Sequence, residues 1–420
     1  MFVQEQIVKL SKRLKDIEER PNPNYLKCNK LMYEMQLEEW LEVEEDWKTG
    51  NKPFSSGLGA LARPLGFHEL AFSAMGDRVS NAVKYRELAA NKFGFPDKSC
   101  DRTMAALGLY LNGDIPLPKL MVTSRGPCEP LRWSEMSAAK YLGILSFEIQ
   151  RLNSNGEDNL RCLAEQWAEL IEFAETCVPG IKYDEEKLIE AFELQQEARP
   201  YIYDLYELRK RVPSPLSNQD AARLGPAPPA VDRWSKGMEY LKAYHDEMFE
   251  RAEKGTGRVG EEKLRIAWLN TFNYGRGTMD LLTEKGVSLV YFGYGGGPSN
   301  FGLYGYDPLD ESAYGRKLTP LEEMAARGNY NVWGNQAEAV GDTLTRACRE
   351  LKIDAVVDFL QVGCYVTKGL STITAERVKN EVGIPTLGLE GREHYMTEGE
   401  QAEMYKKLEE FLDMCIANKN

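Results

Sequence analysis

The sequence predicts an α/β fold with two lobes, each organised around an open parallel sheet. Short apolar runs alternate with longer segments of helical spacing, and this alternation indicates strand–helix–strand units. The clearest unit is residues 354–392, where an apolar strand at 355–362 is followed by a helix and by a second strand at 386–389. Because similar runs occur in residues 52–154 and 262–420, we expect two Rossmann-like or flavodoxin-like lobes with helical N-terminal and connecting segments.

The order of these segments along the chain divides it into four parts. Residues 1–51 have apolar side chains at helical spacing and are expected to form helices. Residues 52–154 are the first α/β lobe, residues 155–261 are a helical connecting region, and residues 262–420 are the second α/β lobe. A chain of 420 residues is long enough for more than one core. The glycine-rich stretch 52–71 is expected to be a loop that leads into the first lobe.

Composition and charge argue against several classes of protein. The net charge is −13 and no basic stripe occurs, which argues against nucleic acid and anionic membranes as partners. No run of about 18 apolar residues occurs, so no membrane-spanning helix is expected. The charged first 20 residues lack the apolar centre of a signal peptide, so the cytoplasm is the expected location. No P-loop, HExxH or GxSxG motif is present, so ATP binding by a P-loop and Ser-His-Asp catalysis have no support.

The eight cysteines are the residues most open to a chemical interpretation. No CxxC pair occurs, so any metal cluster must join cysteines that are far apart in the chain. Cys128 and Cys364 repeat one arrangement, in which a strand is followed by a glycine turn, the cysteine and a helix. Cys100 lies near the expected start of a helix, where the helix dipole favours a thiolate. Ligands bind open α/β sheets at the carboxyl ends of the strands, so all three are candidates for a site.

Two interpretations of these cysteines remain open from the residues alone. Three thiolates are one too few for a closed iron–sulfur or zinc site, but they suit a cluster with one iron open to substrate or solvent. The other interpretation is that they are small residues at tight turns. The glycine-rich segment 293–307 is equally ambiguous, since it suits either a loop that approaches a phosphate or thioester or a simple crossover loop.

From about residue 52 to the C-terminus the sequence resembles the 2-hydroxyacyl-CoA dehydratase and benzoyl-CoA reductase subunit family. The resemblance is carried by SCDRTMAALG with Cys100, LPKLMVTSRGPCEPLRW with Cys128, VPSPL, GEEKLRIAW, and DAVVDFLQVGC with Cys364. Members of this family hold a [4Fe–4S] cluster through three cysteines and leave one iron without a cysteine ligand. The resemblance therefore implies such a cluster on Cys100, Cys128 and Cys364. It also implies an acyl-CoA substrate, a homologous cluster-bearing partner subunit and a separate ATP-hydrolysing activator that donates electrons.

Within this family the segment GLSTITAERVKNEVGIPTLGLEG most resembles the larger cluster-bearing subunit of ATP-dependent benzoyl-CoA reductases. That resemblance implies single-electron reduction of an aromatic acyl-CoA at low potential. The alternative is a subunit of a 2-hydroxyacyl-CoA dehydratase, which eliminates water by a radical route. A further alternative is a structural partner subunit without a cluster. Dehydratase subunits usually carry a Trp-Ser/Cys-x-Ser motif before Pro-Glu, whereas the equivalent stretch here is FSSGLGALARPLGFHEL, without the tryptophan.

Seven residues in three loops are candidates for contact with the acyl-CoA, and no catalytic residue is assigned. Three lie in the early loop, where dehydratases carry a serine and a glutamate. Two lie on the turn after the strand 263–268, and two lie in the glycine-rich loop. The seven are Ser55, Ser56, Glu69, Tyr274, Arg276, Gly295 and Gly296.

Overall fold

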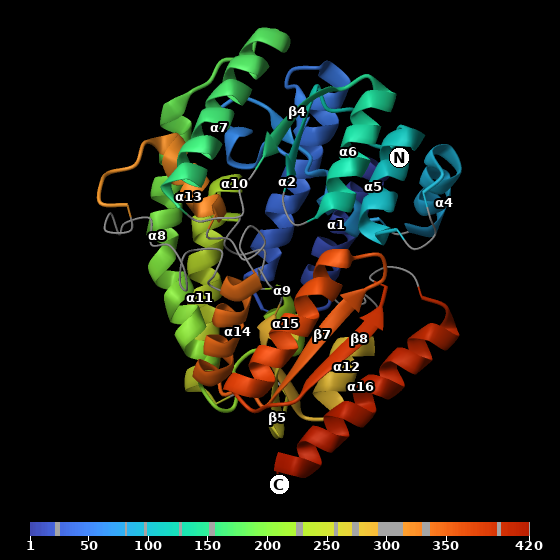
Figure 1. The fold of residues 1–420 in the computed structure, drawn as a ribbon, viewed down its shortest axis with the longest axis vertical. Coiled ribbons are helices and arrows are strands. Elements are labelled where there is room, and N and C mark those ends of the chain that lie inside the picture. Colours follow the sequence, from blue (N-terminus) through green and yellow to red (C-terminus); the bar gives the residue numbers. More distant parts are fainter. Residues whose placement is uncertain are drawn as a thin grey trace.

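Two parallel sheets of four strands each form the centre of the molecule (Figure 1). This computed structural model describes residues 1–21, 26–79, 82–95, 99–125, 128–150, 156–223, 230–255, 259–270, 277–292, 314–329, 337–392 and 396–419. The candidates Tyr274, Arg276, Gly295 and Gly296 lie outside the described residues. The predicted α/β class with two parallel-sheet lobes is confirmed.

The first sheet has the strand order β2-β1-β3-β4. Its strands are β1 (Phe54–Ser56), β2 (His68–Glu69), β3 (Leu120–Arg125) and β4 (Leu145–Gln150). The prediction that residues 52–71 form a loop is wrong, because β1 and β2 both lie in this stretch. Strands of two or three residues are too short to show an alternating pattern, and a mean strand has about 5–6 residues. The pairing of β1 with β3, and of β2 with β1, makes the stretch part of the sheet.

The helices of the first lobe follow the strands closely. They are η1 (Gly59–Leu61), α3 (Phe72–Asp77), α4 (Ala82–Phe93), α5 (Asp101–Asn112) and α6 (Glu129–Leu142). The sequence predicts the start of α6 only at Ser134, but the helix begins directly after Cys128. Pro130 lies in its first turn, where proline has no hydrogen bond to lose. The earlier start makes Cys128 part of the helix terminus.

The second sheet repeats the order of the first, as β6-β5-β7-β8. Its strands are β5 (Leu264–Leu269), β6 (Val287–Phe292), β7 (Ala355–Gln361) and β8 (Thr386–Gly391). The helices are α12 (Gly277–Glu284), α13 (Pro320–Asn329), α14 (Ala337–Glu350), α15 (Tyr365–Glu381) and α16 (Glu398–Lys419). In each sheet the second strand along the chain pairs on one side of the first strand, and the third and fourth strands are added on the other side. The point of reversal lies between β1 and β3 in the first sheet and between β5 and β7 in the second.

The remaining helices of the described chain lie before the first lobe and between the two lobes. They are α1 (Phe2–Glu19), α2 (Asn29–Thr49), α7 (Glu157–Cys177), α8 (Glu185–Arg209), α9 (Asn218–Arg223), α10 (Ala230–Arg233) and α11 (Gly237–Glu253). Helices α8 and α11 run along one side of the molecule past both halves (Figure 1). The largest hydrophobic cluster extends from Phe2 and Trp40 in the N-terminal helices through Leu107 of α5 to Trp268 and Phe359 in the second sheet. The two lobes therefore share one core.

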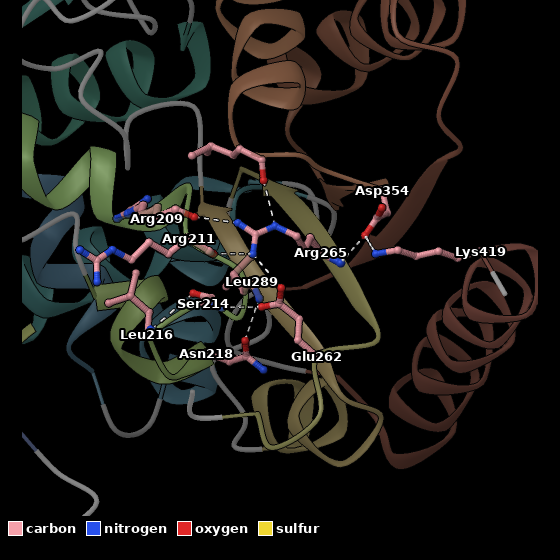
Figure 2. A network of polar contacts seen from close by, with 11 residues as sticks. Arg209, Arg211, Ser214, Leu216, Asn218, Glu262, Arg265, Leu289, Asp354 and Lys419 are labelled. Atoms are coloured by element: carbon pink, nitrogen blue, oxygen red, sulfur yellow. Dashed lines mark hydrogen bonds and ion pairs between the residues drawn. The ribbon is translucent and has the colours of Figure 1, made fainter. Parts of the chain in front are cut away.

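A buried arginine fastens the connecting helices to the second lobe (Figure 2). The side chain of Arg265, on β5, is 2 % exposed and forms an ion pair at 2.7 Å with Glu262, which is 3 % exposed. Its guanidinium also donates to the backbone oxygens of Arg209, Arg211 and Leu351 at 2.7–3.0 Å. One side chain thus satisfies three carbonyl groups from the end of α8 and the turn before β7. This network fixes the end of α8 against the start of the interior strand β5 in the second sheet.

Candidate functional site

The three candidate cysteines occupy equivalent positions at the ends of helices. Cys100 is the N-cap of α5, Cys128 is the N-cap of α6 and Cys364 is the N-cap of α15. The free backbone N–H groups and the helix dipole make this end of a helix favourable for a thiolate. Cys28 is also an N-cap, of α2, but it is buried, whereas the three candidates are partly exposed.

Two of these cysteines follow the strands at which the sheets reverse direction. Cys128 comes after β3, which lies beside the point of reversal of the first sheet, and Cys364 comes after β7, which lies beside that of the second. Parallel sheets open a crevice at this point, outside the carboxyl ends of the strands. The fold therefore provides one cysteine at the ligand-binding end of each lobe.

The three thiols lie close enough to affect one another. Burial is the main reason why the pKa of the Cys128 thiol is raised to about 12. The charges of Cys100, Cys364 and Glu135 contribute to this rise, and a hydrogen bond with the Leu131 backbone opposes it. The charges of both other candidate cysteines thus act on the Cys128 thiol, and one of them, Cys364, belongs to the opposite lobe. No three His, Cys, Asp or Glu side chains among the described residues are arranged to hold a single metal ion.

Cysteine thiolates are the ligands of [4Fe–4S] clusters, and three of them leave one iron without a cysteine ligand. A [4Fe–4S] cluster places each thiolate on a different iron, so its cysteines lie further apart than ligands of one zinc ion. The three candidate thiols are partly exposed, lie at helix N-termini and come from both lobes. Their mutual repulsion also disfavours the thiolate form unless positive charge is placed among them.

A carboxylate held by the first two strands lies in the same region. The register of β1 and β2 places Ser55 beside Glu69. The Ser55 hydroxyl donates to Glu69 Oε2 at 2.6 Å, and the Gly57 backbone N–H donates to Oε1 at 2.7 Å. A side chain at Gly57 would meet the Val122 carbonyl oxygen at 2.0 Å, so glycine is required for this turn. Burial raises the pKa of Glu69, and the hydrogen bonds from Ser55 and the Gly57–Gly59 backbone oppose the rise.

Ser56 and Tyr110 form the next part of the site. Ser56 is fully buried, and its hydroxyl accepts a hydrogen bond from the Phe72 backbone N–H at 3.0 Å. The Phe72 ring stacks on Tyr110 of α5, with ring centroids 5.6 Å apart. Tyr110 is 2 % exposed, and burial raises its pKa, as do the carboxylates of Glu69 and Glu135. A hydrogen bond with the Ser56 side chain opposes this rise.

Glu135 joins the carboxylate region to the cysteines. It lies on α6 seven residues after Cys128, so the two residues are on the same face of the helix, two turns apart. Its side chain is buried, at 8 % exposure. Burial raises the pKa of Glu135 to about 8, and the charge of Glu69 contributes to the rise. Because Glu135 also acts on Cys128, the structure brings the predicted Ser55–Glu69 pair and the predicted cysteines into one electrostatically coupled group.

Sequence reasoning missed Tyr110 and Glu135 for identifiable reasons. Tyr110 lies in an apolar helical segment, where an aromatic residue is typical of the core. The spacing of seven residues between Cys128 and Glu135 is a usable signal, but only if the helix is known to begin at Cys128. The predicted start at Ser134 removed that signal.

A buried ion triad holds Cys100 against the second lobe. Asp101, which follows Cys100 directly, has a side chain that is 0 % exposed. Its Oδ1 atom lies 3.0 Å from Arg86 Nε on α4 and 2.9 Å from Arg392 Nη1, just after β8. Arg392 belongs to the second lobe, so this contact fixes the start of α5 relative to the lobe that carries Cys364.

Comparisons with known proteins agree on one kind of enzyme. The family model described as 2-hydroxyglutaryl-CoA dehydratase, D-component, matches residues 67–415. The alpha subunit of (R)-phenyllactyl-CoA dehydratase from Clostridium sporogenes is 23% identical over 98% of this chain and 99% of its own length. Lactoyl-CoA dehydratase subunit alpha from Anaerotignum propionicum is 23% identical over 73% of this chain and 71% of its own length. No helix in the described part of the chain is long and apolar enough to cross a bilayer.

Proposed function

The chain belongs to the 2-hydroxyglutaryl-CoA dehydratase D-component family, and from this premise we propose that it is a subunit of an enzyme that removes water from a 2-hydroxyacyl-CoA. Both relatives are named as alpha subunits of such dehydratases. The comparisons therefore favour the dehydratase alternative over the benzoyl-CoA reductase reading that the segment 369–391 suggested.

The observation that carries this proposal is the Glu69 carboxylate, which is held by Ser55 and Gly57 and coupled through Glu135 to Cys128. Removal of water takes one proton from carbon and returns one to the departing oxygen. Such chemistry needs a base at a fixed position, and a partly buried carboxylate with two hydrogen-bond donors provides one. Ser55 and Gly57 orient Glu69 as the base, and Ser56 holds the Phe72 backbone at the wall beside it.

Cys100, Cys128 and Cys364 are proposed to hold a [4Fe–4S] cluster with one iron that lacks a cysteine ligand. When bound, the cluster supplies a Lewis-acidic iron for a substrate oxygen and a site for a single electron. The support is the shared N-cap position of the three cysteines and the effect of two of them on the third. The Asp101–Arg392 contact positions Cys100 and Cys364 relative to each other.

A partner subunit and an electron donor complete the proposed enzyme. The two relatives are alpha subunits, which by name have at least one further subunit. We propose that this chain likewise pairs with a homologous cluster-bearing subunit, and that a separate ATP-hydrolysing activator donates the electrons, because this sequence has no P-loop of its own.

Turnover of matched substrates tests the proposed function. The chain is purified without oxygen together with its partner subunit and activator, and is supplied with phenyllactyl-CoA, lactyl-CoA or benzoyl-CoA. We expect redox-neutral loss of water from at least one 2-hydroxyacyl-CoA, with electrons needed only in catalytic amounts. Reduction of benzoyl-CoA with consumption of two electrons per product, and no dehydration, would instead establish the reductase reading.

The Glu69→Gln variant tests the role of the carboxylate. Glutamine keeps the shape of the side chain and can still bind Ser55, but it cannot accept a proton from carbon. We expect kcat to fall by about 10²–10⁴-fold, which is the usual contribution of a positioned general base, and KM to change much less. Steady-state kinetics of the complex measure both constants.

The matched control for this prediction is Glu87→Gln, on the exposed face of α4 in the same lobe. It makes the same chemical change at a site outside the coupled group and should leave kcat unchanged. A loss of less than tenfold in the Glu69→Gln chain would show that Glu69 is not the base.

A further inference from the structure

We propose that the two lobes open and close about Pro200 in α8, and that the ion pair between Asp101 and Arg392 is the contact that holds them closed. Opening gives a ligand a path to the buried side chains of the candidate site, such as Ser56 and Glu135, which are 0 % and 8 % exposed. The motion is a property of the fold, so it goes beyond the proposed reaction and does not depend on it.

The first support is the distribution of contacts between the lobes. Among the described elements, the strands β1–β4 and the helices α3–α6 make no extensive contact with β5–β8, α12 or α14–α16. Helix α8 instead packs against both lobes. Leu188 and Phe192, in its first half, belong to the hydrophobic cluster that contains Leu120 of β3. Tyr206, in its second half, belongs to the cluster that contains Ala267 of β5. Helix α8 is therefore a bridge between the two sheets.

The second support is a proline at the point where α8 passes from one lobe to the other. Pro200 lies inside the helix, between Phe192 and Tyr206. Proline has no backbone N–H, so the carbonyl of Gln196 lacks the hydrogen bond that a helix normally gives it, and the ring crowds that turn. Prolines are a usual cause of sharp helix bends, and hinge motions are concentrated at a few residues. Pro200 is also exposed, so its side chain does not anchor the helix in the core.

The third support is a contact on the side of the molecule opposite to α8. Figure 1 shows α8 on the left and α5 and β8 on the right. Asp101 Oδ1, at the start of α5, lies 2.9 Å from Nη1 of Arg392, which follows β8. The same oxygen lies 3.0 Å from Nε of Arg86 in the first lobe. When Arg392 moves away, Asp101 keeps Arg86 as a partner. This lowers the cost of separating the lobes, because no buried carboxylate is left without a cation.

A rigid molecule and a hinged molecule predict different effects of mutation. In a rigid molecule, Pro200 and Arg392 contribute only to stability, and the lobes keep one separation whichever residue stands at these positions. In a hinged molecule, replacing Pro200 narrows the range of separations, and replacing Arg392 shifts the population toward the longer ones. The two substitutions therefore act differently on one measured quantity.

Pulsed electron spin resonance measures the separation in the full chain together with its partner subunit. Spin labels are attached to unnatural amino acids at the exposed positions of Glu87 in α4 and Ala402 in α16, which leaves the eight cysteines unmodified. The unaltered complex should show a closed and a longer distance. Arg392→Met should increase the population of the longer distance at least about threefold, and Arg392→Lys, which keeps the charge, should increase it less. Pro200→Ala should narrow the distribution to one distance without lowering the melting temperature, because alanine is the best helix former.

The matched control is Glu193→Ala, which introduces alanine at another exposed position of α8 and keeps the proline. Its distances should equal those of the unaltered complex. One narrow distance in both the unaltered and the Arg392→Met complexes, or an unchanged distribution in the Pro200→Ala complex, would overturn the inference. The Pro200→Ala result decides the question even if the Arg392→Met chain does not fold. Because the distances are measured without turnover, such a result leaves the proposed dehydration intact, whereas absence of dehydration by the unaltered complex contradicts the proposed function alone.

Discussion

The Cys128→Ser chain is expected to contain no [4Fe–4S] cluster and to have no detectable activity. Serine has nearly the same size as cysteine but a far weaker affinity for iron, and the remaining two thiols from separate helices cannot retain a cluster alone. We choose Cys128 because the charges of both Cys100 and Cys364 affect the pKa of its thiol. Iron and sulfide analysis of the protein purified without oxygen measures the loss.

Two further variants make this expectation specific. Cys364→Ser should lose the cluster in the same way, because Cys364 is the proposed ligand from the second lobe, at the start of α15. Cys177→Ser should keep it, because Cys177 is the last residue of α7, away from the three N-caps. Equal iron contents in all three variants would contradict the assignment of the ligands.

The Arg265→Met chain is expected to lose about 3–5 kcal/mol of stability, the usual effect of removing one partner of a buried ion pair. Methionine fills much of the space but leaves Glu262 as a buried charge without its partner. It also leaves the carbonyls of Arg209, Arg211 and Leu351 without their donor. The urea concentration at the midpoint of unfolding, compared with that of the unaltered chain, measures the effect.

The same network contains a control at its exposed end. Lys419 forms an ion pair with Asp354 at 2.6 Å, but its side chain is 42 % exposed. Lys419→Gln should change stability by less than about 0.5 kcal/mol, because water screens exposed ion pairs. Similar losses for both variants would show that burial of Arg265 does not determine its contribution.

Much of the architecture follows from patterns in the sequence. The runs that form β5 and β7 are mostly apolar, as expected for strands covered on both faces, and their positions agree with the prediction within a residue or two. The strands β1 and β2 were missed because five residues in total carry no periodic signal. They exist because β3 offers an edge for β1 to pair with, and this pairing is a tertiary effect.

The site was only partly accessible from the sequence for the same reason. The arrangement of strand, turn, cysteine and helix is local, so the placement of Cys364 between β7 and a helix could be predicted and is confirmed. Cys128 follows a strand as predicted, but its helix starts earlier than the predicted Ser134. Contact of Ser55 with Glu69 depends on the register of two short strands, and the coupling of Glu135 to Glu69 depends on the packing of α6. Neither contact can be predicted from the spacing of residues along the chain.

The contact between Asp101 and Arg392 joins residues that are 291 positions apart, and this has a consequence for biosynthesis. During translation the start of α5 leaves the ribosome long before β8 has been made. The arginine that fixes Asp101 to the second lobe is therefore made 291 positions after Asp101. Any group shared by Cys100 and Cys364 can be inserted only after residue 364 has been made.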